Sequence, residues 1–266
     1  MDCEPKVTPA EALYMMCGAR KVTVERVALD TTDSTNNYVC TLPLAGHERW
    51  LLVTAEFQRA GRGSGTNSWE SAVGENLLLS LRLRPMSLEA CRMFSLSEVF
   101  SLSLLDTVSA YAKGFSIKWP NDLYHRDDKV AGMLIENSLA GSMVADSTLG
   151  LGLNVNQMRF ESDAPTPVST AQIVGRRLER EDLLGSLMAH FARRMAQLEE
   201  GADEALHKEY CARLYRREGV HPYADAEGVF CAAIEGVEPD GHLLLRDTVG
   251  RLRKYAFKEV QYIKDK

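Results

Sequence analysis

Residues 54–69 read Thr-Ala-Glu-Phe-Gln-Arg-Ala-Gly-Arg-Gly-Ser-Gly-Thr-Asn-Ser-Trp and contain the most informative pattern in this chain. Three glycines, Gly61, Gly63 and Gly65, surround Arg62. Glycine lets backbone N–H groups approach a ligand closely, and successive N–H groups in such a turn form a concavity that binds anions. The arginine adds a planar set of donors that suits phosphate. The stretch predicts a cradle for a phosphate or a carboxylate, although an ordinary surface loop has a similar composition.

The segments on either side of this loop predict strands. Residues 50–53 form an apolar run that indicates a strand leaving a core, and residues 76–83 indicate the following strand. A dinucleotide-binding turn joins a strand to a helix, and a Walker motif requires a lysine after its glycines. Neither description applies here, so the loop indicates an anion site of another class.

Composition places the chain among acidic globular proteins. With 266 residues and 45% hydrophobic content, it can bury the core of one large domain, alone or with a small second one. A net charge of -6 and a pI near 5.6 argue against nucleic acid as a partner. No apolar run reaches membrane-spanning length, and the N-terminus lacks the pattern of a secretory signal. Scattered cysteines and histidines, without any Cys-x-x-Cys pair, indicate reduced thiols in the cytoplasm and no zinc site.

The segment before the loop predicts one strand and the start of a helix. Residues 1–21 show no pattern to which we assign a role, and residues 22–29 alternate enough to predict an opening strand. Residues 30–37 concentrate Asp, Ser, Thr and Asn, which are the side chains that cap helix N-termini. The same groups could also hold a polar ligand.

A helix and then a strand are predicted after the loop. Residues 88–113 carry apolar side chains at helical spacing and predict a long helix, which Gly114 ends. Pro120 keeps Trp119 out of helical conformation, so a strand runs up to the proline and breaks into a turn. Lys118 and Trp119 are expected on opposite sides of that strand, since side chains alternate.

The next two segments predict a hairpin and a glycine-lined strand. Residues 129–136 follow turn residues and predict a returning strand, which brings Lys129 back beside Asn121 and Asp122. Residues 148–156 alternate glycine with leucine. Glycines on one face of a strand leave a slot in which a flat apolar ligand fits, although a bend in the sheet would also explain them.

The remaining residues predict a loop, helices and a small β unit. Residues 160–169 are rich in Pro, Ser and Asp and predict a loop that folds over a ligand, and Ser169 is expected to cap a short helix ending at Val174. Residues 181–214 show a helical apolar face. Short strands of a barrel-like unit are predicted over residues 228–234, 243–246 and 251–257.

Five motifs together resemble those of the biotin protein ligase family. They occur in the family's order and at compatible spacing over about residues 30–157, and this joint occurrence is far more specific than any single motif. The motifs are Asp33-Ser34-Thr35-Asn36, Gln58 with Gly61-Arg62-Gly63, Lys118-Trp119-Pro120-Asn121-Asp122, Lys129-Val130-Ala131-Gly132 and Gly150-Leu151-Gly152-Leu153-Asn154. The resemblance implies an α+β fold. Residues 1–217 would form a class II synthetase-like biotin/lipoate ligase catalytic domain with a mixed β-sheet, and residues 218–266 a small SH3-like β-barrel.

The resemblance also implies the substrates and the residues that bind them. Such a biotin–[acetyl-CoA-carboxylase] ligase forms biotinyl-5′-AMP from biotin and ATP with Mg²⁺, then transfers biotin to a lysine of a biotin carboxyl carrier protein domain. The residues implied for biotin are Ser34, Thr35, Asn36, Gln58, Gly61, Arg62, Gly63, Lys129, Gly132, Gly150 and Gly152. Those implied for ATP and the adenylate are Arg62, Trp69, Lys118, Trp119, Asn121 and Asn154. The implied catalytic residues are Arg62, Asp122 and Lys129, and Asp122 would also lie near magnesium.

The implied chemistry requires charge neutralisation rather than a protein nucleophile. The carboxylate of biotin, with a pKa close to that of Glu at about 4.3, is already anionic at neutral pH. Arg62, Lys129 and magnesium would neutralise the two anions that meet at the α-phosphate. In the second step the acceptor lysine, with a pKa of about 10.4, must lose a proton. Asp122 is the candidate acceptor of that proton.

Two features depart from the family pattern. Some members carry an N-terminal winged helix-turn-helix, whereas only about thirty residues precede Ser34. We therefore expect a ligase without repressor function, acting as a monomer or a homodimer. Members usually follow Gly-Arg-Gly with another arginine, whereas here Ser64 follows, and no Lys or Arg occurs between Arg62 and Arg82. We expect weaker retention of the adenylate unless another base compensates.

Three alternatives remain open. A lipoate–protein ligase shares the fold and the acyl-adenylate chemistry, although the Gly-Arg-Gly and Trp-Pro-Asn-Asp stretches favour biotin. An octanoyltransferase needs an activated cysteine, and no cysteine lies in these motifs. A non-catalytic biotin-binding regulator would not need Lys129 and Asp122 together.

Overall fold

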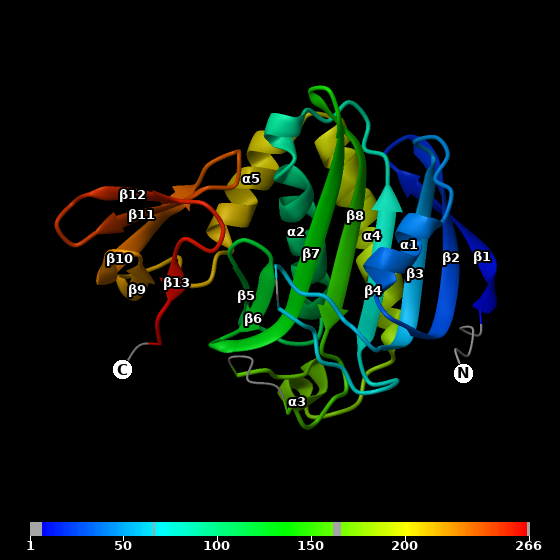
Figure 1. The fold of residues 1–266 in the computed structure, drawn as a ribbon, viewed down its shortest axis with the longest axis horizontal. Helices are drawn as coiled ribbons and strands as arrows, with labels where there is room; N and C mark the ends of the chain where they lie inside the picture. The colour runs from blue at the N-terminus through cyan, green and yellow to red at the C-terminus, as the bar shows by residue number, and fades with distance from the viewer. Residues whose placement is uncertain (1–6, 66, 162–165, 265–266) are drawn as a thin grey trace.

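The computed structural model describes residues 7–65, 67–161 and 166–264. Its elements form one large mixed sheet with helices on both faces and a smaller sheet beside it (Figure 1). The large sheet has the order β1-β2-β3-β4-β8-β7-β6-β5, and its neighbours are antiparallel except for the parallel pair β2–β3. Its strands are β1 (Val7–Cys17), β2 (Arg20–Thr32), β3 (Arg49–Gln58), β4 (Leu77–Leu83), β5 (Phe115–Lys118), β6 (Asp122–His125), β7 (Asp128–Ala140) and β8 (Met143–Leu153).

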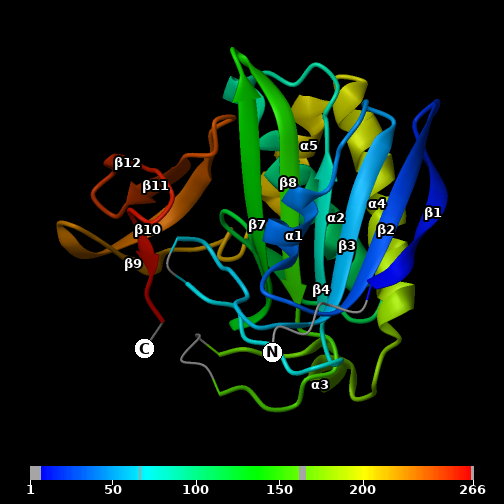
Figure 2. The same cartoon turned by 45° about the vertical axis from the view of Figure 1, so that its right-hand side comes forward.

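The main hydrophobic core lies between this sheet and three helices on one of its faces. These helices are α2 (Ser95–Ser109), α4 (Arg180–Glu199) and α5 (Asp203–Ala212), and Figure 2 shows α2 and α4 behind the sheet and α1 (Thr35–Thr41) in front of it. Phe191 of α4 packs edge-on against Trp50 of β3 and Phe100 of α2, at ring-centroid distances of 5.4 and 5.8 Å. The three rings are buried and hold the helices on the sheet. Among the described helices, none is long and apolar enough to cross a membrane.

The opposite face of the sheet holds small and polar side chains near its centre. In β8, Leu149, Leu151 and Leu153 belong to the helix-side core, so Gly150 and Gly152 lie on the α1 face, as the alternating sequence predicts. Ser80 of β4 lies opposite Gly150 in the β-ladder and donates a hydrogen bond to the Thr35 hydroxyl at the start of α1. This face therefore leaves room in front of β7 and β8.

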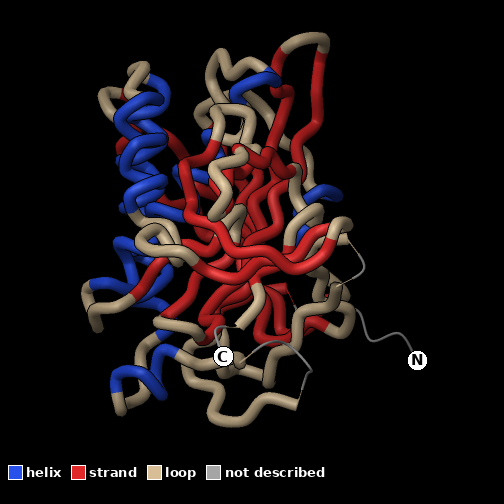
Figure 3. Tube along the Cα trace, turned by 90° about the vertical axis from the view of Figure 1, so that its left-hand side faces the viewer, coloured by secondary structure: helices blue, strands red, loops and turns tan. Residues whose placement is uncertain are grey.

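The smaller sheet is antiparallel, with the order β12-β11-β10-β9-β13, and is formed by C-terminal residues. Figure 3 has this side of the molecule facing the viewer. The Trp119 Nε1 group, at the end of β5, donates a hydrogen bond of 2.9 Å to the carbonyl oxygen of Gly241 in the smaller sheet's connecting turn. The turn after β5 is thereby attached to this sheet. The strands are β9 (His221–Asp225), β10 (Gly228–Val237), β11 (Leu243–Asp247), β12 (Leu252–Tyr255) and β13 (Gln261–Tyr262).

Several predicted elements are confirmed. The strand over residues 76–83, the hairpin that returns at Lys129 and the glycine-lined strand all form, as β4, β6–β7 and β8. Ser169 caps α3 (Thr170–Val174) in a capping box with Gln172, as expected. Of the loop predicted over residues 160–169, residues 162–165 lie outside the described part.

Three strands were not predicted, and a fourth is longer than predicted. Residues 7–17, to which we assigned no role, form the edge strand β1, whose exposed Leu13, Tyr14 and Met16 hide the alternation that marks a strand. The strand predicted over residues 50–53 continues to Gln58, because β3 keeps pairing with β2 up to Thr32. Strands β9 and β13 were not predicted, since each is short and needs a partner from elsewhere in the chain.

The two predicted helices were too long. The first spans only Ser95–Ser109, because residues 90–92 form a short 3-10 helix and the C-cap is Ala110, ahead of Gly114. The helix predicted over residues 181–214 is interrupted between α4 and α5, where Gly201 adopts a positive φ of 86°. Such a conformation favours glycine and ends a helix.

Gly185→Ala is expected to stabilise the protein by about 0.5–1 kcal/mol. Gly185 lies on the exposed side of α4, and a Cβ built there meets nothing within 4 Å. Alanine in a helix interior loses less conformational entropy on folding than glycine does. Urea unfolding measures the change. A destabilised variant would show that the exposed side of α4 packs against something, such as a second copy of the chain.

Candidate active site

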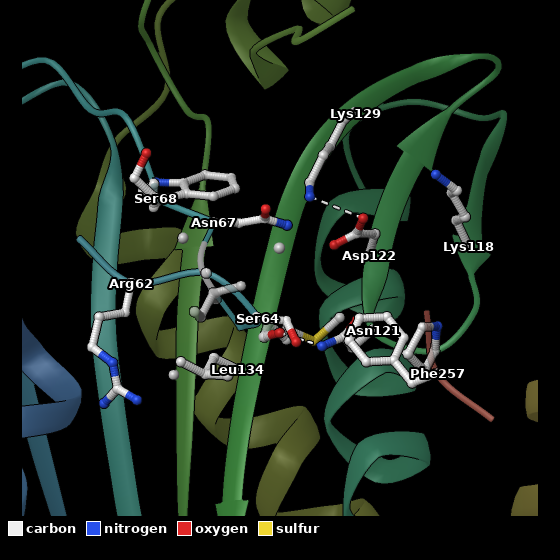
Figure 4. A pocket seen from close by; sticks show the side chains of 18 of the residues that line it. Arg62, Ser64, Asn67, Ser68, Lys118, Asn121, Asp122, Lys129, Leu134 and Phe257 are labelled. Atoms are coloured by element: carbon white, nitrogen blue, oxygen red, sulfur yellow. Dashed lines mark hydrogen bonds and ion pairs between the residues drawn. The ribbon is translucent and has the colours of Figure 1, made fainter. Parts of the chain in front are cut away.

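The space on the α1 face forms a cavity of about 600 Å³. Its walls come from the N-terminal end of α1, the glycine-rich loop, the turn between β5 and β6, strands β7 and β8, and the segment that precedes and includes β13. Motifs far apart in the sequence thus meet around one cavity (Figure 4). The residues implied by the resemblance that line it are Ser34, Thr35, Asn36, Gln58, Arg62, Gly63, Trp69, Lys118, Trp119, Asn121, Asp122, Lys129, Gly132, Gly150 and Gly152.

Three glycines make room for two large polar or aromatic side chains. An ideal Cβ at Gly150 would lie 2.9 Å from Asn36 Cγ, and one at Gly152 would lie 2.7 Å from Trp69 Cδ2. At Gly132, the Cβ would lie 3.0 Å from the same indole ring. The glycines therefore leave space on this face of the sheet, and in this structure the side chains of Asn36 and Trp69 occupy that space.

A hydrogen-bonded cluster surrounds the start of α1. The Oε1 atom of Gln58 accepts from the backbone N–H of Thr35 at 2.7 Å and from its hydroxyl at 3.1 Å. Ser34 occupies the N-cap position but makes no side-chain capping bond, although it is buried. Since Gln58 uses its oxygen here, its amide N–H groups and the Ser34 hydroxyl are the donors available to a polar ligand.

Lys129 and Asp122 form an ion pair at the other end of the cavity. Lys129 Nζ lies 2.9 Å from Asp122 Oδ2, and both side chains are about one-quarter exposed (Figure 4). The register of β6 and β7 produces this approach, since Asp122 pairs with Gly132, whose missing side chain leaves space for both groups. The side-chain N–H of Asn121 donates a hydrogen bond to the carbonyl oxygen of Met133 in β7, and this bond holds Asn121 beside the ion pair.

Arg62 lies across the cavity from that ion pair (Figure 4). Its guanidinium forms an ion pair with Glu136 at 2.7 Å and donates to the Asn37 side chain at 2.8 Å. Glu136 was not predicted as a site residue, because a carboxylate in a strand carries no sequence signal of its partner.

The glycine-rich loop closes partly on itself. The N–H of Gly63 donates to the Asn67 carbonyl at 2.7 Å, and the N–H of Trp69 donates to the Gly61 carbonyl at 2.9 Å. The Gly63 N–H is therefore not directed at the cavity, in contrast to the anion cradle predicted from sequence. Gly61 itself lies outside the lining of the cavity, and a Cβ there would come within 2.6 Å of the Trp69 carbonyl oxygen.

Two buried polar atoms near the cavity lack a hydrogen-bond partner among the described residues. They are Trp69 Nε1 and Asn154 Oδ1. Asn154 does not line the cavity, and its side-chain amide donates weakly, at 3.4 Å, to the Val168 carbonyl behind it. A buried polar atom without a partner is uncommon, so both positions are consistent with a ligand that supplies the missing bond.

Lys118 is a half-buried cation of the cavity. Its Nζ lies 3.0 Å from the Tyr124 hydroxyl and over the rings of Tyr124 and Tyr262, 4.8 and 5.2 Å from their centroids. Burial lowers the pKa of Lys118, and nearby Asp122 opposes that shift. An ammonium whose charge is poorly compensated favours an anionic ligand.

Lys118→Met is expected to stabilise the ligand-free protein by about 1 kcal/mol at pH 7. The folded-state pKa lies below the unfolded one, so the buried charge costs stability below the folded pKa, and the cost disappears as the pH rises toward 10.5. The difference in the free energy of urea unfolding between variant and wild type should therefore be smaller at pH 10 than at pH 7. A variant that is less stable than wild type at pH 7 would mean that the contacts of Lys118 with the tyrosines stabilise the fold more than burial of its charge destabilises it.

Comparison with known proteins places this chain in a ligase family. A model of the biotin/lipoate A/B protein ligase family matches residues 28–154. The chain is 33% identical over 238 residues to the biotin–[acetyl-CoA-carboxylase] ligase of Paracoccus denitrificans, covering 84% of this chain and 95% of that protein. The chain therefore belongs to the biotin/lipoate A/B protein ligase family.

Other relatives are longer, and solved structures agree on the fold. The bifunctional ligase/repressor of Salmonella typhimurium is 34% identical over 163 residues, which are 60% of this chain and 50% of that protein. The chain thus spans about half the length of that relative. The structure of a biotin protein ligase from Aquifex aeolicus in complex with biotin and ATP matches with a TM-score of 0.75 and 21% identity, over 90% of this chain and 99% of that one. The predicted fold class is confirmed: a mixed-sheet catalytic domain with a small C-terminal antiparallel sheet.

Proposed function

We propose that this chain is an ATP-dependent biotin–[acetyl-CoA-carboxylase] ligase, which forms biotinyl-5′-AMP and transfers biotin to a lysine of a biotin carboxyl carrier protein domain. The observation that carries the proposal is the meeting of all five sequence motifs around a single cavity of about 600 Å³. Such a volume is in the range of cavities that bind small organic ligands. The Paracoccus relative bears the name of this activity.

Biotin would occupy the glycine-lined half of the cavity. Its flat bicyclic ring needs an apolar slot and a few polar groups at the ureido end. Gly150 and Gly152 supply the slot, and the unused Ser34 hydroxyl and Gln58 amide supply donors at one end. Trp69 would have to shift where the ligand enters above Gly152, and its place on a loop permits that movement.

Lys129 would meet the carboxylate and the α-phosphate. A carboxylate oxygen of biotin attacks the α-phosphorus of ATP, the bond to the bridging oxygen breaks, and pyrophosphate leaves. Both reactants are anions, so their approach needs a fixed cation. The Lys129 ammonium is held at 2.9 Å by Asp122 and projects into the cavity, which supports this role. Arg62 would add its charge only after releasing Glu136.

Magnesium fits the donor set around Asp122. Mg²⁺ binds through one or two carboxylates together with the phosphates of its nucleotide. Asp122 offers the carboxylate, and the side-chain oxygen of Asn121 is available because its amide group bonds to Met133. A bound Mg²⁺ would supply charge neutralisation for the phosphates.

In the second step, an amine nitrogen of the carrier's lysine attacks the acyl carbon, and AMP leaves with the bonding electron pair. The attacking ammonium must first lose a proton. Asp122 is the carboxylate that lines the described cavity, and its 2.9 Å contact with Lys129 fixes its orientation. We propose that Asp122 accepts this proton.

We further propose that residues 1–217 and 218–266 form the catalytic and C-terminal domains. The chain enters the smaller sheet at His221, and a separate antiparallel ladder begins there, which supports a boundary near 217. We also propose a cytoplasmic location. The five described cysteines are unpaired thiols, which is typical of reducing compartments.

The test is ATP–pyrophosphate exchange with biotin, with lipoate and with neither. Biotin-dependent exchange, followed by transfer to a purified carrier domain, supports the proposal. Exchange with lipoate instead would assign the chain to the lipoate branch of the family. Biotin binding without any exchange would indicate a non-catalytic regulator.

A further inference from the structure

The glycine-rich loop brings little positive charge of its own to the cavity. It contains Arg59, which pairs with Asp33 and does not line the cavity, and Arg62, and no Lys or Arg occurs between Arg62 and Arg82. Arg62 is neutralised by Glu136 and lies across the cavity from Lys129. Lys129 is itself paired with Asp122. The wall formed by the loop therefore has no uncompensated cation from its own residues.

A lysine from the turn between β12 and β13 lies against this wall. Lys258 lines the cavity, and its Nζ donates a hydrogen bond of 3.2 Å to the carbonyl oxygen of Ser64. A Cβ built at Gly65 would lie 3.3 Å from Lys258 Cε and would overlap the ammonium. The loop thus accommodates the lysine because residue 65 is a glycine, whose φ of 67° also favours that residue. The two segments are 194 residues apart in sequence.

Neighbouring residues shape the turn that carries the exposed Lys258. Phe257, the preceding residue, also lines the cavity and packs edge-on against Trp119 at a centroid distance of 6.2 Å. Glu259 accepts a hydrogen bond of 2.7 Å from the backbone N–H of Ala256, which closes the turn that presents the lysine. The backbone of Lys258 itself has a φ of 72°, a conformation that non-glycine residues seldom adopt without a reason.

The charge of Lys258 is available to a ligand. Among the residues that the structure describes, no carboxylate forms an ion pair with it. An ammonium has three N–H donors, and the contact with the Ser64 carbonyl uses one. By contrast, the cations at Arg62 and Lys129 are both paired with carboxylates.

We propose that Lys258 is a binding residue for the nucleotide phosphate, reaching over the cavity from the turn between β12 and β13 to supply the cation that the glycine-rich loop lacks. This inference rests on the proposed function and names the C-terminal residue that retains its intermediate. The bound acyl-adenylate would then be held between the loop and this turn, so loss of Lys258 should speed its escape.

The test measures the binding of biotinol-5′-AMP, an analogue in which a phosphate ester replaces the reactive anhydride. Lys258→Gln is expected to raise its dissociation rate about five- to tenfold, as for the loss of one partly exposed charge-assisted contact. Lys258→Arg should stay close to wild type. Lys264→Gln is the charge-matched control, because Lys264 is exposed on the same C-terminal segment and does not line the cavity. The salt dependence of binding should also weaken in Lys258→Gln alone.

A charge relocation separates ligand binding from a merely structural tether. Ser64→Arg places a cation on the loop at the point that Lys258 contacts. It should slow dissociation strongly in the Lys258→Gln background and weakly in wild type, where the two cations would repel each other. If Lys258→Gln lowers the unfolding temperature but leaves analogue dissociation at the wild-type rate, the lysine only joins the two segments and the inference is wrong. Failure of the wild-type protein to bind the analogue at all would instead refute the proposed function.

Discussion

Lys129→Ala is expected to lower biotin-dependent ATP–pyrophosphate exchange by about 10² or more while the protein stays folded. The ammonium of Lys129 is held 2.9 Å from Asp122 at the cavity wall, where two anions would have to meet. Its removal leaves their repulsion uncompensated in a site of restricted solvent access, so the transition state loses more than the bound substrates do. The effect should therefore appear in kcat.

Two further variants test whether the loss of exchange is specific to Lys129. Lys113→Ala removes a lysine that is exposed and outside the cavity lining, and exchange should stay at the wild-type rate. Asp122→Asn keeps the shape of the ion-pair partner while removing its charge. If Asp122 accepts the proton, this variant should lower the rate of biotin transfer to the carrier lysine more than the rate of ATP–pyrophosphate exchange. Exchange by Lys129→Ala near the wild-type rate would exclude Lys129 from the active site.

Local sequence patterns predicted the parts of the site that depend on strand geometry. The approach of Lys129 to Asp122 follows from a hairpin with a short turn, and the single face of Gly150 and Gly152 follows from the two-residue period of a strand. Both features are set by neighbours within a few residues. The same reasoning predicted Ser169 as a helix cap, and the structure adds Gln172, three residues away, as its capping-box partner.

Contacts between distant segments were not predictable in this way. The partner of Arg62 is Glu136, and the residue beside Ser64 is Lys258, which lies in the turn between β12 and β13. Neither partner has a distinctive local context. The orientation of the Gly63 N–H was also missed, because whether a loop closes on itself depends on a register that glycine content does not determine. The interruption between α4 and α5 was not predicted, because the apolar spacing continues through Leu206 and Tyr210, which are both buried.

Gly152→Ala is expected to weaken biotin and ATP binding roughly 10- to 100-fold, with the fold preserved. The added methyl group would lie 2.7 Å from Trp69 Cδ2, so the indole must move away from the strand. Inserting a methyl group into a filled space costs about 1–3 kcal/mol, and here Trp69 can shift with its loop, so the cost should appear in ligand binding more than in folding. Isothermal titration with biotin and thermal unfolding measure the two effects.

Gly236→Ala is the matched control, because Gly236 also lies in a strand and a Cβ there meets nothing within 4 Å. Biotin affinity of Gly152→Ala within about threefold of wild type would show that biotin does not use the slot between Gly152 and Trp69.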